Sequence, residues 1–146
     1  MGANINTGAA GSMTFTVVAR DAAGHSASAT AFYTVGFTVR PVFDQSASIQ
    51  RGKTLGVAIQ LADAAGRNVS SASIPVVVTG LRAVSNGAAL PLRDSDWLNP
   101  DHAFRFGFGA YVYALNTKGL TAGTYELQFT TGSDPLAHTV RFTIGR

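Results

Sequence analysis

The chain has 146 residues, of which 46% are hydrophobic and 13% charged, and its formal net charge is +3. This composition excludes a disordered tail, because enough apolar surface is present to offset the entropy lost when a core becomes ordered. The 11 basic and 8 acidic residues are dispersed, so the sequence lacks the lysine and arginine cluster that nucleic-acid binding requires.

Two further absences restrict the possible classes. No apolar run reaches the ~20 residues of a membrane-spanning helix, so membrane insertion is not expected. No charged-then-apolar signal segment follows Met1, so an export signal would lie upstream of this sequence. The lack of cysteine excludes disulfides, thiolate metal sites and cysteine nucleophiles, and leaves core packing to stabilise the fold.

Short runs with apolar residues at alternate positions recur about every ten residues, separated by Gly, Asn, Asp and Pro. In chain order, the predicted strands cover residues 13–20, 28–35, 36–43, 55–62, 74–79, 104–108, 111–116, 124–130 and 138–144. These strands leave no room for a long helix. The predicted fold class is all-β: an immunoglobulin-like antiparallel β-sandwich with an additional N-terminal β-hairpin.

The run at 55–62 shows the alternation most clearly, with Leu55, Val57, Ile59 and Leu61 at every second position. Side chains two residues apart in a strand share a face, so these four are predicted to face the core. The same rule predicts inward positions for Ile74, Val76, Val78, Leu127, Phe129, Val140, Phe142 and Ile144.

The two ends of the chain have related patterns. Gly11 begins an alternating run that is followed, after a turn, by residues 29–35, and Gly123 begins a similar run followed by residues 138–144. Each pattern is typical of the closing hairpin of a sandwich, which suggests two tandem domains of related design. Residues 1–35 are therefore predicted to be the closing hairpin of a truncated immunoglobulin-like domain, and residues 36–146 a sandwich module.

The predicted N-terminal hairpin needs a partner, because an isolated two-stranded hairpin is marginally stable in water and exposes unpaired backbone groups. Neighbouring domains of the same polypeptide are the first expected partner. Self-association of the chain through residues 1–35, by strand donation or swapping, is the alternative. In that case the chain would be a filament or oligomer subunit.

Residues 108–127, FGAYVYALNTKGLTAGTYEL, resemble the C-terminal half of the PxKF family, and the resemblance extends over residues 36–146. Residues 14–35, TFTVVARDAAGHSASATAFYTV, are similar to the closing hairpin of HYR and bacterial immunoglobulin-like repeats. These families are extracellular adhesive or spacer modules of bacterial proteins, without catalytic residues. The resemblance implies a non-catalytic structural, spacer or adhesion module of a larger secreted or cell-surface protein.

Tyr125 stands two residues after Gly123, at the start of a predicted strand. This is the tyrosine-corner position of immunoglobulin-like sandwiches, where the hydroxyl bonds to upstream backbone. A structural role is therefore predicted for Tyr125, with ligand contact as the alternative.

The longest predicted loop contains Asp94, Asp96 and Asp101. Ca²⁺ takes six to eight oxygen ligands, and flexible loops can supply them, so these three residues are candidate calcium ligands. Solvated surface and Asx turns are the alternative. No other cofactor is expected.

The richest aromatic stretch includes Trp97, Phe104 and Phe106, and exposed aromatic rings can stack on sugars. Alternation places Phe104, Phe106 and Phe108 on one face. A carbohydrate-binding module is therefore the second functional hypothesis, against core packing of the same rings. Enzyme activity is not expected, because the chain lacks a G-x-S-x-G motif and Glu126 is its only glutamate.

Overall fold

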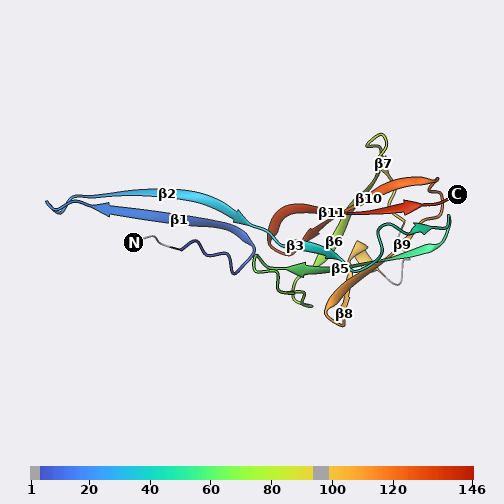
Figure 1. Ribbon diagram of the computed structural model, residues 1–146, viewed down its shortest axis with the longest axis horizontal. Coiled ribbons are helices and arrows are strands. Elements are labelled where there is room, and N and C mark those ends of the chain that lie inside the picture. The colour runs from blue at the N-terminus through green and yellow to red at the C-terminus, as the bar shows by residue number, and fades with distance from the viewer. Residues whose placement is uncertain (1–3, 94–98) are drawn as a thin grey trace.

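The computed structural model describes residues 4–93 and 99–146, and nearly all of its regular structure is β-strand. The N-terminal part is a long hairpin of β1 (Gly11–Arg20) and β2 (Ser26–Val35), which form a two-stranded sheet of their own. The hairpin projects from one end of the molecule as a two-stranded ribbon, and the segment before β1 runs beside it (Figure 1). The Asp21 carboxylate closes the hairpin tip by accepting the N–H groups of Ala23 and His25, each at 2.9 Å.

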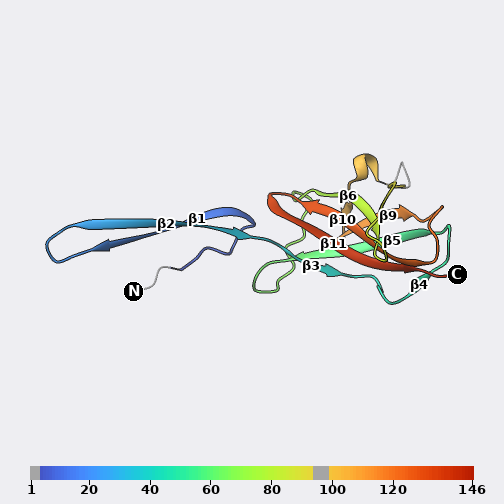
Figure 2. The same cartoon turned by 90° about the horizontal axis from the view of Figure 1, so that it is seen from above.

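The rest of the chain forms a sandwich of two sheets, beyond which the hairpin extends (Figure 2). One sheet has the order β4–β11–β10–β6–β7, and its strands are β4 (Ser48–Ile49), β6 (Val76–Ala83), β7 (Ala89–Leu90), β10 (Gly123–Thr131) and β11 (Asp134–Ile144). The other has the order β3–β5–β9–β8, and its strands are β3 (Thr38–Pro41), β5 (Thr54–Ala62), β8 (Arg105–Gly107) and β9 (Ala110–Asn116). Neighbouring strands are antiparallel except β4 and β11, which are parallel. A short 3-10 turn, η1 (Pro100–His102), precedes β8.

The strand order is that of an immunoglobulin-like domain. Such domains place strands A, B, E and D in one sheet and strands C, F and G in the other. Here β3, β5, β9 and β8 correspond to A, B, E and D, and β6, β10 and β11 correspond to C, F and G. The predicted fold class, an all-β immunoglobulin-like sandwich with an additional N-terminal hairpin, is confirmed.

The hydrophobic core lies between the two sheets. Leu55, Val57, Ile59 and Leu61 are all buried, as the alternation in β5 predicts. The other residues predicted to face inward are also buried, except Ile74, which is partly buried and packs against the core from the loop before β6. Each of these side chains contributes about 1.5–3 kcal/mol on burial, so one core suffices to hold the sandwich together.

Several strand limits differ from the prediction for local reasons. β4 and β7 have two residues each, too few to show a period of two. β6 continues past its predicted end because β10 pairs with it as far as Ala83. β8 ends early, since Phe108 and Gly109 both have positive φ and form the tight turn into β9.

Candidate functional site

A buried carboxylate lies at the junction between the hairpin and the sandwich. Only Gly36 and Phe37 connect β2 to β3. The Asp134 side chain, which is fully buried at the start of β11, accepts the Phe37 N–H at 2.8 Å. The oxygen that accepts the Phe37 N–H, Oδ2, also lies 2.8 Å from Nε2 of His138. The second oxygen, Oδ1, accepts the Leu136 N–H at 2.9 Å. One charged group of the sandwich therefore binds the backbone of the linker directly.

These contacts also determine the charge of the group. Burial by itself raises the pKa of Asp134, but the hydrogen bonds from the Leu136 and Phe37 N–H groups and from His138 outweigh it. The pKa is held below its usual value, so the group is a carboxylate at neutral pH. Hydrogen bonds to a charged acceptor are about twice as strong as neutral ones, which makes Asp134 an effective anchor for the linker.

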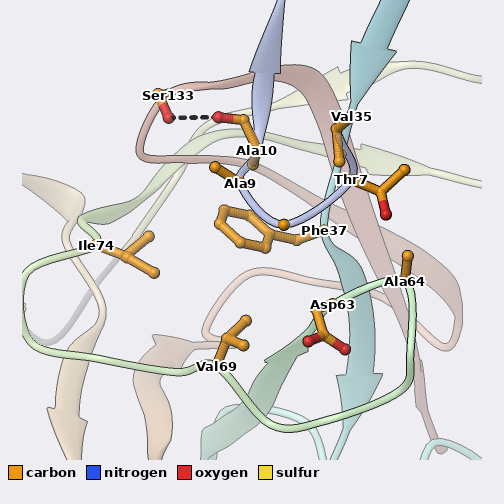
Figure 3. A pocket seen from close by; sticks show the side chains of 12 residues that line it. Thr7, Ala9, Ala10, Val35, Phe37, Asp63, Ala64, Val69, Ile74 and Ser133 are labelled. Atoms are coloured by element: carbon orange, nitrogen blue, oxygen red, sulfur yellow. Dashed lines mark hydrogen bonds between the residues drawn. The ribbon is translucent and has the colours of Figure 1, made fainter. Parts of the chain in front are cut away.

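Gly36 allows β11 to approach the linker closely. A Cβ atom at Gly36 would lie 2.7 Å from Cδ1 of Leu136 and 3.2 Å from Oδ2 of Asp134. On the other side of the junction, the Ser133 hydroxyl donates to the Ala10 carbonyl at 3.1 Å (Figure 3). Ser133 in the turn before β11 thus contacts the segment that enters the hairpin, and Asp134 and Leu136 of β11 contact the segment that leaves it.

A hollow of about 290 Å³ remains between residues 7–10 and the sandwich loops (Figure 3). The side chains around it are mostly apolar and include those of Phe37, Val69 and Ile74. Its one carboxylate, Asp63, accepts the N–H groups of Ala65 and Arg67 and the Arg67 guanidinium. The lining therefore offers no free charge for a polar ligand and no acid–base pair, and we interpret the hollow as a packing gap at the junction.

Of the three predicted calcium ligands, Asp101 lies among the described residues. Asp101 lies in η1 with a positive φ of 57°. Asp94 and Asp96 lie outside the described residues, so the calcium site stays a prediction. Within residues 4–93 and 99–146, no three His, Cys, Asp or Glu side chains are grouped in a way that could hold a metal ion.

Two of the three aromatic residues predicted to bind a glycan, Phe104 and Phe106, lie among the described residues and differ in exposure. Phe104 is a core residue with 7% exposure, and its ring centroid lies 5.2 Å from that of Tyr113 and 5.5 Å from that of Phe129. This burial places Phe104 in the core rather than at a sugar-binding face. Phe106 is 38% exposed and packs beside Tyr111, while Trp97 lies outside the described residues.

Tyr125 makes the hydrogen bond expected of a tyrosine corner. Its hydroxyl donates to the Thr121 carbonyl at 2.8 Å, across the bend that leads into β10. The side chain is 4% exposed and stacks on Phe142, so its observed contacts are structural.

Sequence reasoning missed Asp134, the central residue of the junction. It stands in Gly132-Ser133-Asp134-Pro135, which has the composition of an ordinary turn. Its partner Phe37 is 97 residues away in the chain, so no local pattern links the two.

In the part of the chain that the structure describes, no helix is both long enough and apolar enough to cross a bilayer.

Comparison with known proteins identifies no family for the chain. No family model matches the chain, and no curated protein matches it. Among solved structures, the Lin-41 filamin domain is similar at 15% sequence identity and a TM-score of 0.39, over 74% of this chain and 92% of that domain. This likeness is too distant to support an argument about function.

Proposed function

We propose that this chain is a non-catalytic structural module that holds its neighbours in a fixed orientation, as a spacer, adhesion or anchoring unit. The contact between the Asp134 carboxylate and the Phe37 N–H carries the proposal. Units joined by a linker generally move relative to one another unless an interface prevents it. Bending at Phe37 would leave a buried charge without one of its donors, so the junction resists such motion.

The proposed setting is a larger secreted or cell-surface bacterial protein. The resemblance of residues 14–35 and 108–127 to extracellular bacterial modules supports this part of the proposal. A chain without cysteine also suits a module that must be stabilised outside the cell by packing alone. Its partners would be the neighbouring domains of the same polypeptide.

A distance measurement across the junction tests the proposal. Because the chain has no cysteine, Ser28→Cys on the hairpin and Ser85→Cys on the sandwich introduce two unique sites for nitroxide labels. Both positions are exposed. Double electron–electron resonance is expected to give one narrow distance distribution, and Asp134→Ala is expected to broaden it.

Asp44→Ala provides the matched control. Asp44 also accepts backbone N–H groups, but only those of Ser46 and Ala47 on the surface of the sandwich. This substitution should leave the distance distribution unchanged. A broad distribution in the chain that carries only the two cysteines would refute the fixed orientation.

A further inference from the structure

One face of the β1–β2 hairpin is apolar and only partly covered: Met13, Phe15, Tyr33 and Val35 are partly buried, whereas Val17 and the alanines of this face are exposed. The strand register places on this face Met13, Phe15, Val17, Ala19, Ala27, Ala29, Ala31, Tyr33 and Val35. The opposite face is mainly Ser and Thr, with a hydrogen bond of 2.9 Å between the hydroxyls of Thr16 and Thr30, and its two large apolar side chains, Val18 and Phe32, are exposed singly among them. Val17 belongs to the apolar face and is nevertheless 52% exposed. The hairpin thus has the alternating pattern of strands that cover a hydrophobic core, but no second sheet packs on its apolar face among the described residues.

The register of this hairpin repeats that of β10 and β11 within the sandwich. Gly11 lies opposite Val35, and Gly123 lies opposite Ile144. Both glycines have positive φ, 139° for Gly11 and 156° for Gly123. Counted from these glycines, three inward-facing cross-strand pairs of the hairpin match three pairs of β10 and β11. The pair Met13–Tyr33 matches Tyr125–Phe142, and Phe15–Ala31 matches Leu127–Val140. The pair Val17–Ala29 matches Phe129–His138.

The segments that enter the two hairpins are also held in a similar way. The Tyr33 hydroxyl donates to the Asn6 carbonyl at 2.9 Å, and the Tyr125 hydroxyl donates to the Thr121 carbonyl at 2.8 Å. In both hairpins a tyrosine on the inward face fixes the backbone that precedes the first strand. The two tyrosines stand on different strands, Tyr33 at the position of Phe142 and Tyr125 at that of Met13, so this contact to the entering backbone is a similarity in kind and not part of the positional correspondence.

In the sandwich, three neighbours cover β10 and β11. β6 pairs antiparallel with the edge of β10, β4 pairs parallel with the edge of β11, and the β3–β5–β9–β8 sheet covers their apolar face. Among the described residues, β1 and β2 pair only with each other. The hairpin lacks all three of these neighbours.

We infer that β1 and β2 are the last two strands of a second immunoglobulin-like sandwich, and that their apolar face binds its other strands. These strands are supplied by the same polypeptide upstream of the hairpin, as β3 to β9 precede β10. A second copy of this chain does not offer them, because its sandwich is already closed by its own β10 and β11. The inference deepens the proposed function by naming the neighbour that the module holds, and its test does not depend on a rigid junction.

The hairpin also indicates the chemistry of this partner. Its sheet should offer a free strand edge for antiparallel pairing with β1, as β6 does for β10. Ala27, Ala29 and Ala31 give β2 a low surface on the inward face. The covering sheet is therefore expected to present bulky apolar side chains opposite β2, since cores are packed without voids.

The test supplies the missing strands from this chain itself. Residues 36–116, which contain β3 to β9, are fused in front of residue 4 of the full chain. A control fusion places residues 36–144 in front of residues 36–146, so that each sandwich has its own closing hairpin. Because β3 to β9 fit the larger side chains of β11 better than the alanines of β2, we expect amide hydrogen exchange at the free edge of β1 to slow by about tenfold relative to the unmodified chain. If the control fusion folds but exchange at the free edge of β1 is no slower in the test fusion than in the unmodified chain, the inference is overturned.

Two adjacent valines provide a matched pair of variants. Val17 on the apolar face and Val18 on the opposite face are 52% and 58% exposed, so their substitution alters the bare hairpin to a similar degree. Val17→Asp is expected to abolish the slower exchange in the fusion, whereas Val18→Asp keeps it. An equal effect of the two substitutions overturns the inference.

The unmodified chain provides an independent readout. It is expected to be a monomer that binds the apolar dye 8-anilinonaphthalene-1-sulfonate mainly through the apolar face of the hairpin, so Val17→Asp should weaken this binding more than Val18→Asp does. Light scattering that shows a dimer, with β1 edge amides already protected, would identify a second copy as the occupant and overturn the inference.

Discussion

At the scale of single residues, Asp134 shows how a charge can be buried at an acceptable cost. A carboxylate transferred into a protein interior is strongly unfavourable unless hydrogen bonds replace its hydration. Two backbone N–H groups and the His138 ring do this for Asp134, and one of those N–H groups belongs to the linker. The stability of the group and the position of the hairpin are therefore coupled.

Asp134→Asn is expected to lower the free energy of unfolding by about 1–3 kcal/mol at pH 7, because it removes the charge that its donors require. Since the pKa of Asp134 is lowered in the folded state, its contribution is complete above the ordinary aspartate pKa of about 3.9 and is lost as the pH falls through the folded value. Denaturant unfolding should therefore show a difference between the two proteins that is constant above about pH 5 and shrinks in more acidic solution. A difference that grows in acid would contradict this account, and Asp44→Asn is the exposed control.

At the scale of strands, Glu126 connects three neighbouring strands of one sheet. Its carboxylate, 7% exposed, accepts Nε–H of Arg82 on β6 at 2.7 Å and Nε–H of Arg141 on β11 at 2.8 Å. The bonds from Arg82 and then Arg141 lower the pKa of Glu126. In the N-terminal hairpin Thr14 stands at the position of Glu126 and Phe32 at that of Arg141. The two hairpins therefore share their apolar inward face but not the charged residues of the outward face.

The turn between β8 and β9 contains a strained residue. Phe108 and Gly109 are its two central residues, with φ of 51° and 73°, as in the type I′ turns that favour Asn-Gly. A side chain in this left-handed region costs about 1–2 kcal/mol, and the Phe108 ring is fully exposed, so packing does not repay the cost.

Phe108→Asn is therefore expected to raise the free energy of unfolding by about 0.5–1 kcal/mol, because asparagine tolerates positive φ. Chemical denaturation measures the change. The same substitution at Phe106, which packs beside Tyr111, serves as the control and should destabilise the sandwich. No gain from Phe108→Asn would show that the turn is relaxed.

Alternation predicted most of the strands because both sheets bury one face, and in β5 every inward position carries a large apolar residue. It failed for β4 and β7, whose pairing depends on neighbours and not on a pattern of their own. It also grouped Phe104 with Phe108, because a period of two does not show where a strand ends in a tight turn. The junction could not be predicted, since Asp134 and Phe37 meet only after the sandwich has formed.

At the scale of the whole molecule, the chain consists of a closed sandwich and a projecting hairpin with the register of the sandwich's own last two strands (Figures 1 and 2). The linker between them is short and is bonded to a buried charge. A series of such units, each fixed to the next, would form a stiff rod, which is the geometry expected of a spacer.

Residual dipolar couplings of backbone amides in weakly aligned solution test this central claim most directly. If the junction is rigid, couplings from β1 and β2 and couplings from the sandwich will fit a single alignment tensor of one magnitude. Couplings from the hairpin that are scaled toward zero, or that require a tensor of their own, would show that the two parts move independently and would contradict the account.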